Sequence, residues 1–282
     1  MTQEYAYLTG GASGIGLEVA RMLVKNNIKV FIADRDLDGA QKVVDELNQS
    51  GPVAKAAHVD VADWDSQVKA FSQAVAEFGR LDYVHAIAGV GEKVFVPNDP
   101  SLKEYVKPNL TTIDVDLNGV LYTAALAIQQ FRRQEPGQNG FRGKIVAVSS
   151  ICGFYAVPTV PIYTAAKHGV VGFVRSYGKY LPSEKITLNS INPNVVRTNI
   201  SNPAFYDKLE GTNLLTPVSS VVDAFERLLG ANDASGECYE VGPHWEKDGP
   251  VTKSAPEYLD EETKQTMELV YQRALPLHLP QK

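Results

Sequence analysis

The sequence has little cysteine, no long apolar run and no excess of basic residues. Its 282 residues include two cysteines, Cys152 and Cys238, too few for a disulfide framework or a cysteine-ligated metal cluster. No apolar stretch is long enough to span a bilayer, and no signal peptide is expected because the first predicted strand begins almost at Met1. The formal net charge of -6 argues against nucleic acid as a partner, since phosphate binding requires a basic face. We therefore expect a cytoplasmic protein without a metal, nucleic-acid or membrane partner.

The hydrophobic pattern alternates between predicted strands and predicted helices. Short apolar runs predict the strands, and apolar residues at helical spacing predict the helices between them. The strands are expected over residues 5–9, 28–33, 53–59, 81–88, 144–149, 186–191 and 239–241, and the main helices from 14 onward and over 37–47, 68–78, 113–131, 162–180, 221–229 and 261–274. This alternation predicts one doubly wound α/β domain, a parallel sheet with helices on both faces. We expect that domain over residues 1–243, followed by a C-terminal extension over 244–282.

A glycine-rich turn joins the first predicted strand to the first predicted helix. It reads Thr9-Gly-Gly-Ala-Ser-Gly-Ile-Gly16, and glycines there let the backbone approach a pyrophosphate while the helix N-terminus offers free N–H groups. A tight turn without any ligand has the same spacing. Asp34 favours the interpretation with a bound dinucleotide. It follows the glycines by roughly 20 residues, the position at which a carboxylate binds the adenosine ribose 2′-hydroxyl. The alternative role of Asp34 is a helix N-cap.

The charge of Asp34 also predicts which dinucleotide binds. A carboxylate at this position would repel the 2′-phosphate of NADP, so the pattern favours NAD. The following residue, Arg35, is the one feature that softens this preference. We therefore expect NAD as the cofactor.

A second constellation lies where the fifth strand ends and the next helix begins. Ser149 and Ser150 end the strand, and Tyr163 and Lys167 lie four residues apart, on one helical face. Lowering a tyrosine pKa from about 10 to neutrality requires roughly 4 kcal/mol, which one ammonium at about 4 Å supplies in a partly shielded site. Tyr163 is therefore expected to act as general acid or base on a substrate oxygen that Ser150 hydrogen-bonds. The alternative is an amphipathic helix that carries a tyrosine and a lysine by coincidence.

Taken in order, these motifs resemble the short-chain dehydrogenase/reductase family over roughly residues 5–242. The matching segments are Thr9 to Gly16, Asp60-Val61, Ala88-Gly89, Ser150, Tyr163 to Lys167 and Asn192-Pro193. The resemblance implies a Rossmann-like fold and an enzyme that transfers a hydride between NAD(H) and a secondary alcohol or ketone. It also implies a homodimer or homotetramer that associates through the two long helices. The segment from Tyr163 to Phe173 is similar to the branch that contains NAD-dependent 15-hydroxyprostaglandin dehydrogenase.

The same resemblance implies roles for individual residues. Ser150, Tyr163, Lys167 and Asp116 would be catalytic. Asp60 and Val61 would contact the adenine, Lys167 would also hold the nicotinamide ribose, and residues 193–198 would flank the nicotinamide. The full set of expected cofactor-binding residues is Gly10, Ser13, Gly14, Ile15, Gly16, Asp34, Asp60, Val61, Ala88, Gly89, Tyr163, Lys167, Pro193, Val196 and Thr198.

Three positions depart from the family pattern. Residues 86–89 read Ala-Ile-Ala-Gly instead of Asn-Asn-Ala-Gly, which removes two side-chain hydrogen bonds. Asp116 replaces the catalytic asparagine, and Asn118 cannot substitute because residues two apart face different sides of a helix. An ionised Asp116 offers no donor and would favour the protonated form of Lys167. Asn194 replaces a glycine, and we expect it to adopt a left-handed conformation.

The remaining conspicuous residues have structural interpretations. We expect His168 at the helix surface or a subunit contact and His85 in the core. Cys152, near Ser150, either is a small buried residue or lines the site. Residues 198–216 form either a mobile cover over the substrate or a surface loop, and the C-terminal extension either closes the pocket or crosses a subunit interface.

Three functions stay open. The leading hypothesis is an NAD-dependent dehydrogenase that acts on a neutral or apolar small molecule. The alternatives are a cofactor-binding protein with degenerate catalysis, which the Asp116 and Ala-Gly departures motivate, and an isomerase-like multistep enzyme with recycled NAD.

Overall fold

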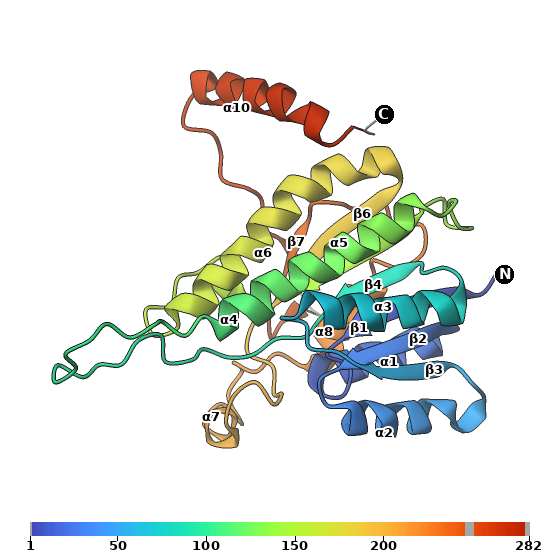
Figure 1. The fold of residues 1–282 in the computed structure, drawn as a ribbon, viewed down its shortest axis with the longest axis horizontal. Helices are drawn as coiled ribbons and strands as arrows, with labels where there is room; N and C mark the ends of the chain where they lie inside the picture. The colour runs from blue at the N-terminus through green and yellow to red at the C-terminus, as the bar shows by residue number, and fades with distance from the viewer. Residues whose placement is uncertain (1, 246–250, 280–282) are drawn as a thin grey trace.

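One eight-stranded sheet organises the computed structural model, which describes residues 2–245 and 251–279 (Figure 1). The strands are β1 (Glu4–Thr9), β2 (Ile28–Asp34), β3 (Ala54–His58), β4 (Tyr83–Ala86), β5 (Gly143–Val148), β6 (Ile186–Pro193), β7 (Cys238–Val241) and β8 (Val251–Thr252), in the spatial order β3-β2-β1-β4-β5-β6-β7-β8. Strands β1 to β7 are parallel, as predicted. The edge strand β8 is antiparallel to β7 and was missed, because two residues show no periodicity.

Helices cover both faces of this sheet. The longer ones are α1 (Gly14–Lys25), α2 (Leu37–Leu47), α3 (Trp64–Phe78), α5 (Gly119–Arg132), α6 (Pro161–Tyr180), α8 (Val218–Glu226) and α10 (Glu261–Ala274). Helices α3, α5 and α6 enclose one hydrophobic core, and α1, α2 and α8 enclose the other. The predicted doubly wound, Rossmann-like α/β fold is therefore confirmed.

Neighbouring residues in the central strands supply the two cores in turn. Tyr7 of β1 and Ile145 of β5 belong to one core, whereas the adjacent Leu8 and Val146 belong to the other. Successive side chains of a strand point to opposite faces of the sheet. Strands that are buried on both faces are therefore continuously apolar, and that is the pattern from which they were predicted.

The helix predicted over residues 113–131 is interrupted. The chain forms a short α4 (Thr111–Ile113), then a π-helical turn over Asp114–Asn118, then α5. Turns of this kind frequently occur at functional sites, and this one carries Asp116. Hydrophobic spacing could not reveal it, because the apolar residues on either side of the turn still fall at helical intervals.

Asn194 does not adopt the left-handed conformation expected for it. Among the described residues, the non-glycine positions with positive φ are Asn27 and Lys185. The N–H of Asn194 donates to the Val241 carbonyl at 2.9 Å, which continues the β6–β7 pairing past the end of β6. The local backbone is therefore not the turn that would require a glycine.

Helix α10 lies at the end of α6 that is remote from Tyr163 (Figure 1). Just beyond α10, the backbone oxygen of His278 accepts a hydrogen bond from the Tyr180 hydroxyl at 3.0 Å, and the His278 ring packs on Tyr177 and Tyr180. No residue of α10 is buried. The division into a domain over residues 1–243 and an extension over 244–282 stays a prediction. Among the helices of the described segments, none combines the length and apolar character needed to cross a bilayer.

Candidate active site

The glycine-rich turn packs against two other strand ends. Gly10 has a φ of 76°, and a Cβ there would lie 2.7 Å from the backbone of Ala88. A Cβ at Gly16 would overlap the Gly10 carbonyl oxygen, and one at Gly14 would lie 3.2 Å from Cγ2 of Thr198. Glycine is therefore required by close backbone approach as well as by backbone conformation. The structure brings these five predicted residues together at the carboxyl edge of the sheet.

The N-terminus of α1 opens onto this turn. Ser13 is its N-cap and makes no side-chain capping hydrogen bond, while Ile15 packs into the core behind the turn. The first N–H groups of a helix have no partner within the helix, and the positive end of the helix dipole points the same way. A phosphate group fits such a position.

Asp34, the last residue of β2, is hydrogen-bonded to the glycine-rich turn. Its Oδ2 accepts a hydrogen bond from Ala12 N–H and its Oδ1 accepts one from Asp36 N–H, both at 2.9 Å. Each carboxylate oxygen keeps a lone pair for a ribose hydroxyl. The alternative N-cap role belongs instead to Asp36, whose side chain accepts from Gly39 N–H at the start of α2. Asp34 is thus free of that role.

The other predicted cofactor contacts lie at the ends of neighbouring strands. Asp60 is exposed, and its Oδ1 accepts a hydrogen bond from Ala62 N–H at 3.0 Å. Pro193 ends β6. Val61 and Val196 are each 7% exposed, so protein already covers most of their side-chain surface. These two side chains belong mainly to the two hydrophobic cores and leave little surface for a ligand.

Ser150, Tyr163 and Lys167 meet where β5 ends beside α6. The hydroxyl of Ser149 donates to the Lys167 carbonyl at 3.0 Å, which ties the strand end to the helix. The Lys167 ammonium lies 5.3 Å from the centre of the Tyr163 ring. Ser150 is 8% exposed and accepts a hydrogen bond from Cys152 N–H at 3.1 Å. The three predicted catalytic side chains therefore form one cluster.

Asp116 completes the cluster as the ion-pair partner of Lys167. Its Oδ2 lies 3.1 Å from the Lys167 Nζ, and the two side chains are 0% and 3% exposed. Asp116 Oδ1 also accepts from Val90 N–H at 2.8 Å, and Lys167 Nζ donates to the Val148 carbonyl at 3.3 Å. Burial lowers the pKa of Lys167, but the Asp116 carboxylate and the Tyr163 phenol outweigh it, and the pKa is raised. The expectation that Asp116 favours the protonated lysine is confirmed.

The pKa of Tyr163 is raised in the protein chain by itself. Burial is the largest cause and raises it, the Lys167 ammonium lowers it, the Asp116 carboxylate raises it, and a hydrogen bond with the Ser150 hydroxyl lowers it. The expectation that Lys167 brings this phenol towards neutrality is therefore wrong for the isolated chain. Desolvation and Asp116 together outweigh a single ammonium.

The hydrogen-bonding role of Thr9 and the whole role of Glu92 were not predicted from the sequence. The hydroxyl of Thr9 accepts hydrogen bonds from Ile87 N–H at 3.2 Å and Ala88 N–H at 3.3 Å, and so fixes the end of β4. The carboxylate of Glu92 accepts from the N–H groups of Ile162 and Tyr163. These partners are separated by more than 65 positions in the sequence, so no local motif could have revealed them.

Cys152 adjoins this cluster, since its N–H donates to the Ser150 hydroxyl, and it is partly exposed rather than buried as expected. The two histidines lie outside the cluster. His85 is buried beside Tyr83 and Phe225, and burial lowers its pKa to about 3. His168 is exposed, with a ring nitrogen 3.0 Å from the Thr164 carbonyl oxygen. Neither histidine faces Tyr163 closely enough to make a hydrogen bond with it.

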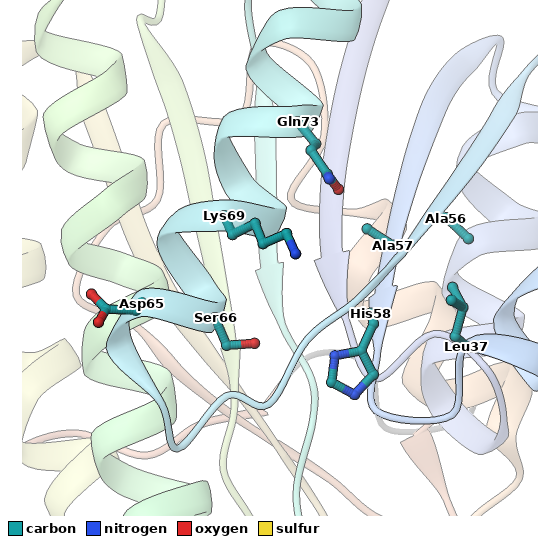
Figure 2. Close-up of a pocket in the computed structure, with 8 residues that line it drawn as sticks. All are labelled: Leu37, Ala56, Ala57, His58, Asp65, Ser66, Lys69 and Gln73. Atoms are coloured by element: carbon teal, nitrogen blue, oxygen red, sulfur yellow. The ribbon is translucent and has the colours of Figure 1, made fainter.

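A separate hollow of about 590 Å³ lies along the edge strand β3. Figure 2 shows Ser66 and Lys69 of α3 facing His58 of β3 and Leu37 across it. Ala56, Ala57, Asp65 and Gln73 complete its lining. Because none of the predicted catalytic residues lines it, this hollow is distinct from the candidate active site.

Comparison with known proteins identifies the family. A family model described as short chain dehydrogenase matches residues 4–208. A short-chain dehydrogenase/reductase of Penicillium rubens is 30% identical over 274 residues, which cover 90% of this chain and 95% of the relative. The (-)-trans-carveol dehydrogenase of Rhodococcus erythropolis is 32% identical over 207 residues, or 69% of this chain and 72% of that enzyme.

A solved structure agrees with this assignment. The 3-ketoacyl-(acyl-carrier-protein) reductase of Brucella melitensis, in a crystal structure with NADH, superposes with a TM-score of 0.71 at 25% identity and covers 85% of this chain and 97% of its own. The relatives are named dehydrogenases and reductases, so this chain is an oxidoreductase, and it belongs to the short-chain dehydrogenase/reductase family.

Proposed function

We propose that this chain oxidises neutral or apolar secondary alcohols with NAD⁺, or reduces the corresponding ketones with NADH. The observation that carries the proposal is that Ser150, Tyr163 and Lys167 lie together at the carboxyl edge of the sheet. The glycine-rich turn reaches the same edge through the contact of Gly10 with Ala88. In open parallel sheets, ligands bind outside this edge, where the strand order reverses. Here the order reverses between β1 and β4.

The residues at this edge fit a bound dinucleotide. The close backbone approach at Gly10 and Gly16 and the free N-terminus of α1 suit a pyrophosphate. The Asp34 carboxylate suits a ribose diol and opposes a 2′-phosphate, so we assign NAD rather than NADP. Bound NAD⁺ would supply the hydride acceptor, and the positive charge of its nicotinamide would favour the phenolate of Tyr163.

The chain's own side chains would handle the proton. In oxidation, the Tyr163 phenolate takes the proton of the alcohol oxygen, and in reduction the phenol returns it. The Ser150 hydroxyl donates a hydrogen bond to the same oxygen. The Lys167 ammonium stabilises the phenolate, and Asp116 keeps that lysine protonated. These four residues are the proposed catalytic machinery.

A panel of secondary alcohols tests this function. The absorbance of reduced nicotinamide would be followed after NAD⁺ is mixed with the chain and with carveol, cyclic alcohols and aliphatic secondary alcohols. We expect NADH to form with at least one of them. If the chain binds NAD but forms no NADH with any alcohol, and consumes none with the ketones, it is the cofactor-binding protein of the first alternative. NAD-dependent conversion without net NADH would indicate the isomerase-like alternative.

Cofactor choice depends on Asp34. Replacement by alanine removes a charged hydrogen-bond acceptor, so kcat/KM for NAD is expected to fall by about tenfold to a hundredfold. The value for NADP should fall less or rise, because the repulsion of the 2′-phosphate is lost. Asp38→Ala, at an exposed position of α2, is the matched control and should change neither. An unchanged NAD-to-NADP ratio in Asp34→Ala would remove Asp34 from the cofactor site.

The pH profile of oxidation is expected to depend on Asp116. Its carboxylate raises the pKa of both Tyr163 and Lys167, so Asp116→Asn lowers both. Oxidation needs the phenolate, so the rise of kcat/KM with pH should occur at lower pH in the variant. Loss of the proton from Lys167 should also begin at lower pH, which moves the alkaline decline in the same direction. A rise that stays in place or moves to higher pH would contradict the proposed role of Asp116.

Two features support a neutral or apolar substrate. Two acidic residues of the expected cover pair with the arginine that precedes it, since Arg197 lies 3.0 Å from Asp207 and 2.9 Å from Glu210. One relative is named for carveol, an uncharged alicyclic alcohol. The kinship of segment 163–173 with the 15-hydroxyprostaglandin dehydrogenase branch stays a prediction, and the relatives described above do not bear that name.

The position of α10 supports one of the two roles foreseen for the extension. It lies near the far end of α6, none of its residues is buried, and it exposes the apolar side chains of Met267, Leu269 and Val270. A subunit interface is therefore the more consistent role, and a homodimer or homotetramer stays our proposal. A cytoplasmic location likewise stays a prediction from the sequence.

A further inference from the structure

Helix α6 begins without a cap of its own. Val160 occupies the N-cap position and makes no side-chain capping hydrogen bond. Pro161 is the first helical residue and has no N–H group. The next two N–H groups, those of Ile162 and Tyr163, are among the orphan donors of the first turn, because no residue of the helix can accept from them. The second of them belongs to the proposed general acid and base itself.

A carboxylate from a distant part of the chain accepts both of these hydrogen bonds. Glu92 Oε2 lies 2.6 Å from the Tyr163 nitrogen, and Glu92 Oε1 lies 3.3 Å from the Ile162 nitrogen. Hydrogen bonds to an ionised acceptor are shorter and stronger than neutral ones. A negative charge at a helix N-terminus is also stabilised by the helix dipole.

The chain that carries Glu92 is itself anchored to the candidate site. Val90 N–H donates to Asp116 at 2.8 Å, and the Gly91 carbonyl accepts from the Thr112 hydroxyl at 3.1 Å. Three consecutive residues, Val90 to Glu92, therefore bind Asp116, α4 and the first turn of α6 in succession. The Lys167 ammonium is held separately by Asp116 and the Val148 carbonyl, so among these contacts those of Glu92 are the ones that reach the first turn of α6.

We propose that Glu92 is a positioning residue, a long-range N-cap that fixes the first turn of α6 and so sets the phenol of Tyr163 against Ser150. This inference rests on the proposed dehydrogenase function. Glu92 acts through the backbone of Tyr163 and does not touch the reacting atoms. Its loss should impair the proton-transfer step more than the binding of cofactor or alcohol, because a shift of about 1 Å in a catalytic group can cost about a hundredfold in rate.

Kinetics of three variants and a control test the proposal. Glu92→Ala removes both acceptors and is expected to lower kcat by about tenfold to a hundredfold, with KM for NAD and alcohol changed by less than about threefold. Glu92→Gln keeps one carbonyl acceptor, so its kcat should lie between that of Glu92→Ala and that of the wild type. Glu92→Asp keeps the charge on a shorter side chain and should recover more of kcat than alanine. Glu104→Ala, at an exposed site in the same connection between β4 and α4, is the control, and its kcat and KM should match those of the wild type.

Amide hydrogen exchange gives a readout that needs no activity. In the protein without cofactor, the N–H groups of Ile162 and Tyr163 should be protected in the wild type and exchange at least about tenfold faster in Glu92→Ala. The later turns of α6, from Val170 onward, should keep their protection.

The two readouts separate the failure of this proposal from the failure of the proposed function. If Glu92→Ala loses protection only at Ile162 and Tyr163, but the wild type oxidises no alcohol, the capping role of Glu92 stands and the dehydrogenase function is rejected. A folded Glu92→Ala variant with wild-type kcat, or unprotected Ile162 and Tyr163 amides in the wild type, would overturn the positioning role. Loss of protection along the whole of α6 would also overturn it, because Glu92 would then stabilise the fold in general.

Discussion

Replacement of Tyr163 by phenylalanine is expected to lower kcat for alcohol oxidation by about a hundredfold to ten-thousandfold, the range that a positioned general acid or base contributes. The substitution removes one oxygen atom and leaves the ring that lies beside the Lys167 ammonium. The phenol is the proposed site of the proton, so no other side chain of the cluster can replace it. Lys167 is paired with Asp116, and the Ser150 hydroxyl serves as a hydrogen-bond donor and keeps its proton.

Binding should separate this loss from misfolding. The Kd for NAD in Tyr163→Phe should stay within about threefold of the wild type, because the glycine-rich turn and Asp34 are untouched. Tyr177→Phe is the matched control, since Tyr177 lies further along the same helix with its hydroxyl 3.2 Å from an Arg132 nitrogen, and its kcat should be unchanged. Activity retained in Tyr163→Phe would reject the catalytic assignment.

Replacement of Lys167 by methionine is expected to lower the free energy of unfolding by about 3–5 kcal/mol, because it leaves the Asp116 carboxylate buried without its partner. Asp116 is 0% exposed, so water cannot substitute for the ammonium. The double variant Asp116→Asn/Lys167→Met should regain most of this loss, since a buried ion pair can often be replaced as a pair at little cost. Chemical denaturation of the two single variants and the double variant measures the coupling.

A second buried lysine provides the control. Lys144 is 2% exposed, burial lowers its pKa to about 8, and its ammonium donates to the Asn232 carbonyl. Lys144→Met leaves no buried carboxylate behind, so its cost should be clearly smaller than that of Lys167→Met. Equal costs in the two lysine variants, or a double variant no more stable than Lys167→Met, would show that the Asp116–Lys167 pair does not carry the predicted coupling.

Much of the fold could be predicted because the sheet is buried on both faces. Strands such as β5 are then almost continuously apolar, with Lys144 as the exception in β5. Helices such as α2 and α6 show helical spacing, so element type and order followed from the pattern. The π-helical turn around Asp116 and the two-residue β8 could not be predicted. Both depend on tertiary packing, and neither alters the hydrophobic spacing on which the prediction relied.

The residues of the candidate site that belong to a short sequence motif could be predicted. Gly10, Asp34, Ser150, Tyr163 and Lys167 each belong to a short pattern with a known structural context, and the structure brings them to one edge of the sheet.

The electrostatics of the site could not be predicted in the same way. The raised pKa of Tyr163 depends on how deeply it is buried and on a direct Asp116–Lys167 contact, neither of which is a property of spacing. Glu92 was missed for the same reason, because its partners lie about 70 residues away.

A crystal structure of the chain with a pair that cannot react, either NADH with an alcohol or NAD⁺ with a ketone, tests the central claim most directly. We expect the Tyr163 hydroxyl and the Ser150 hydroxyl both to lie within hydrogen-bonding distance of the ligand oxygen, about 2.6–3.2 Å, beside the nicotinamide ring. A phenol turned away from the dinucleotide, or a nicotinamide position filled by protein, would contradict it.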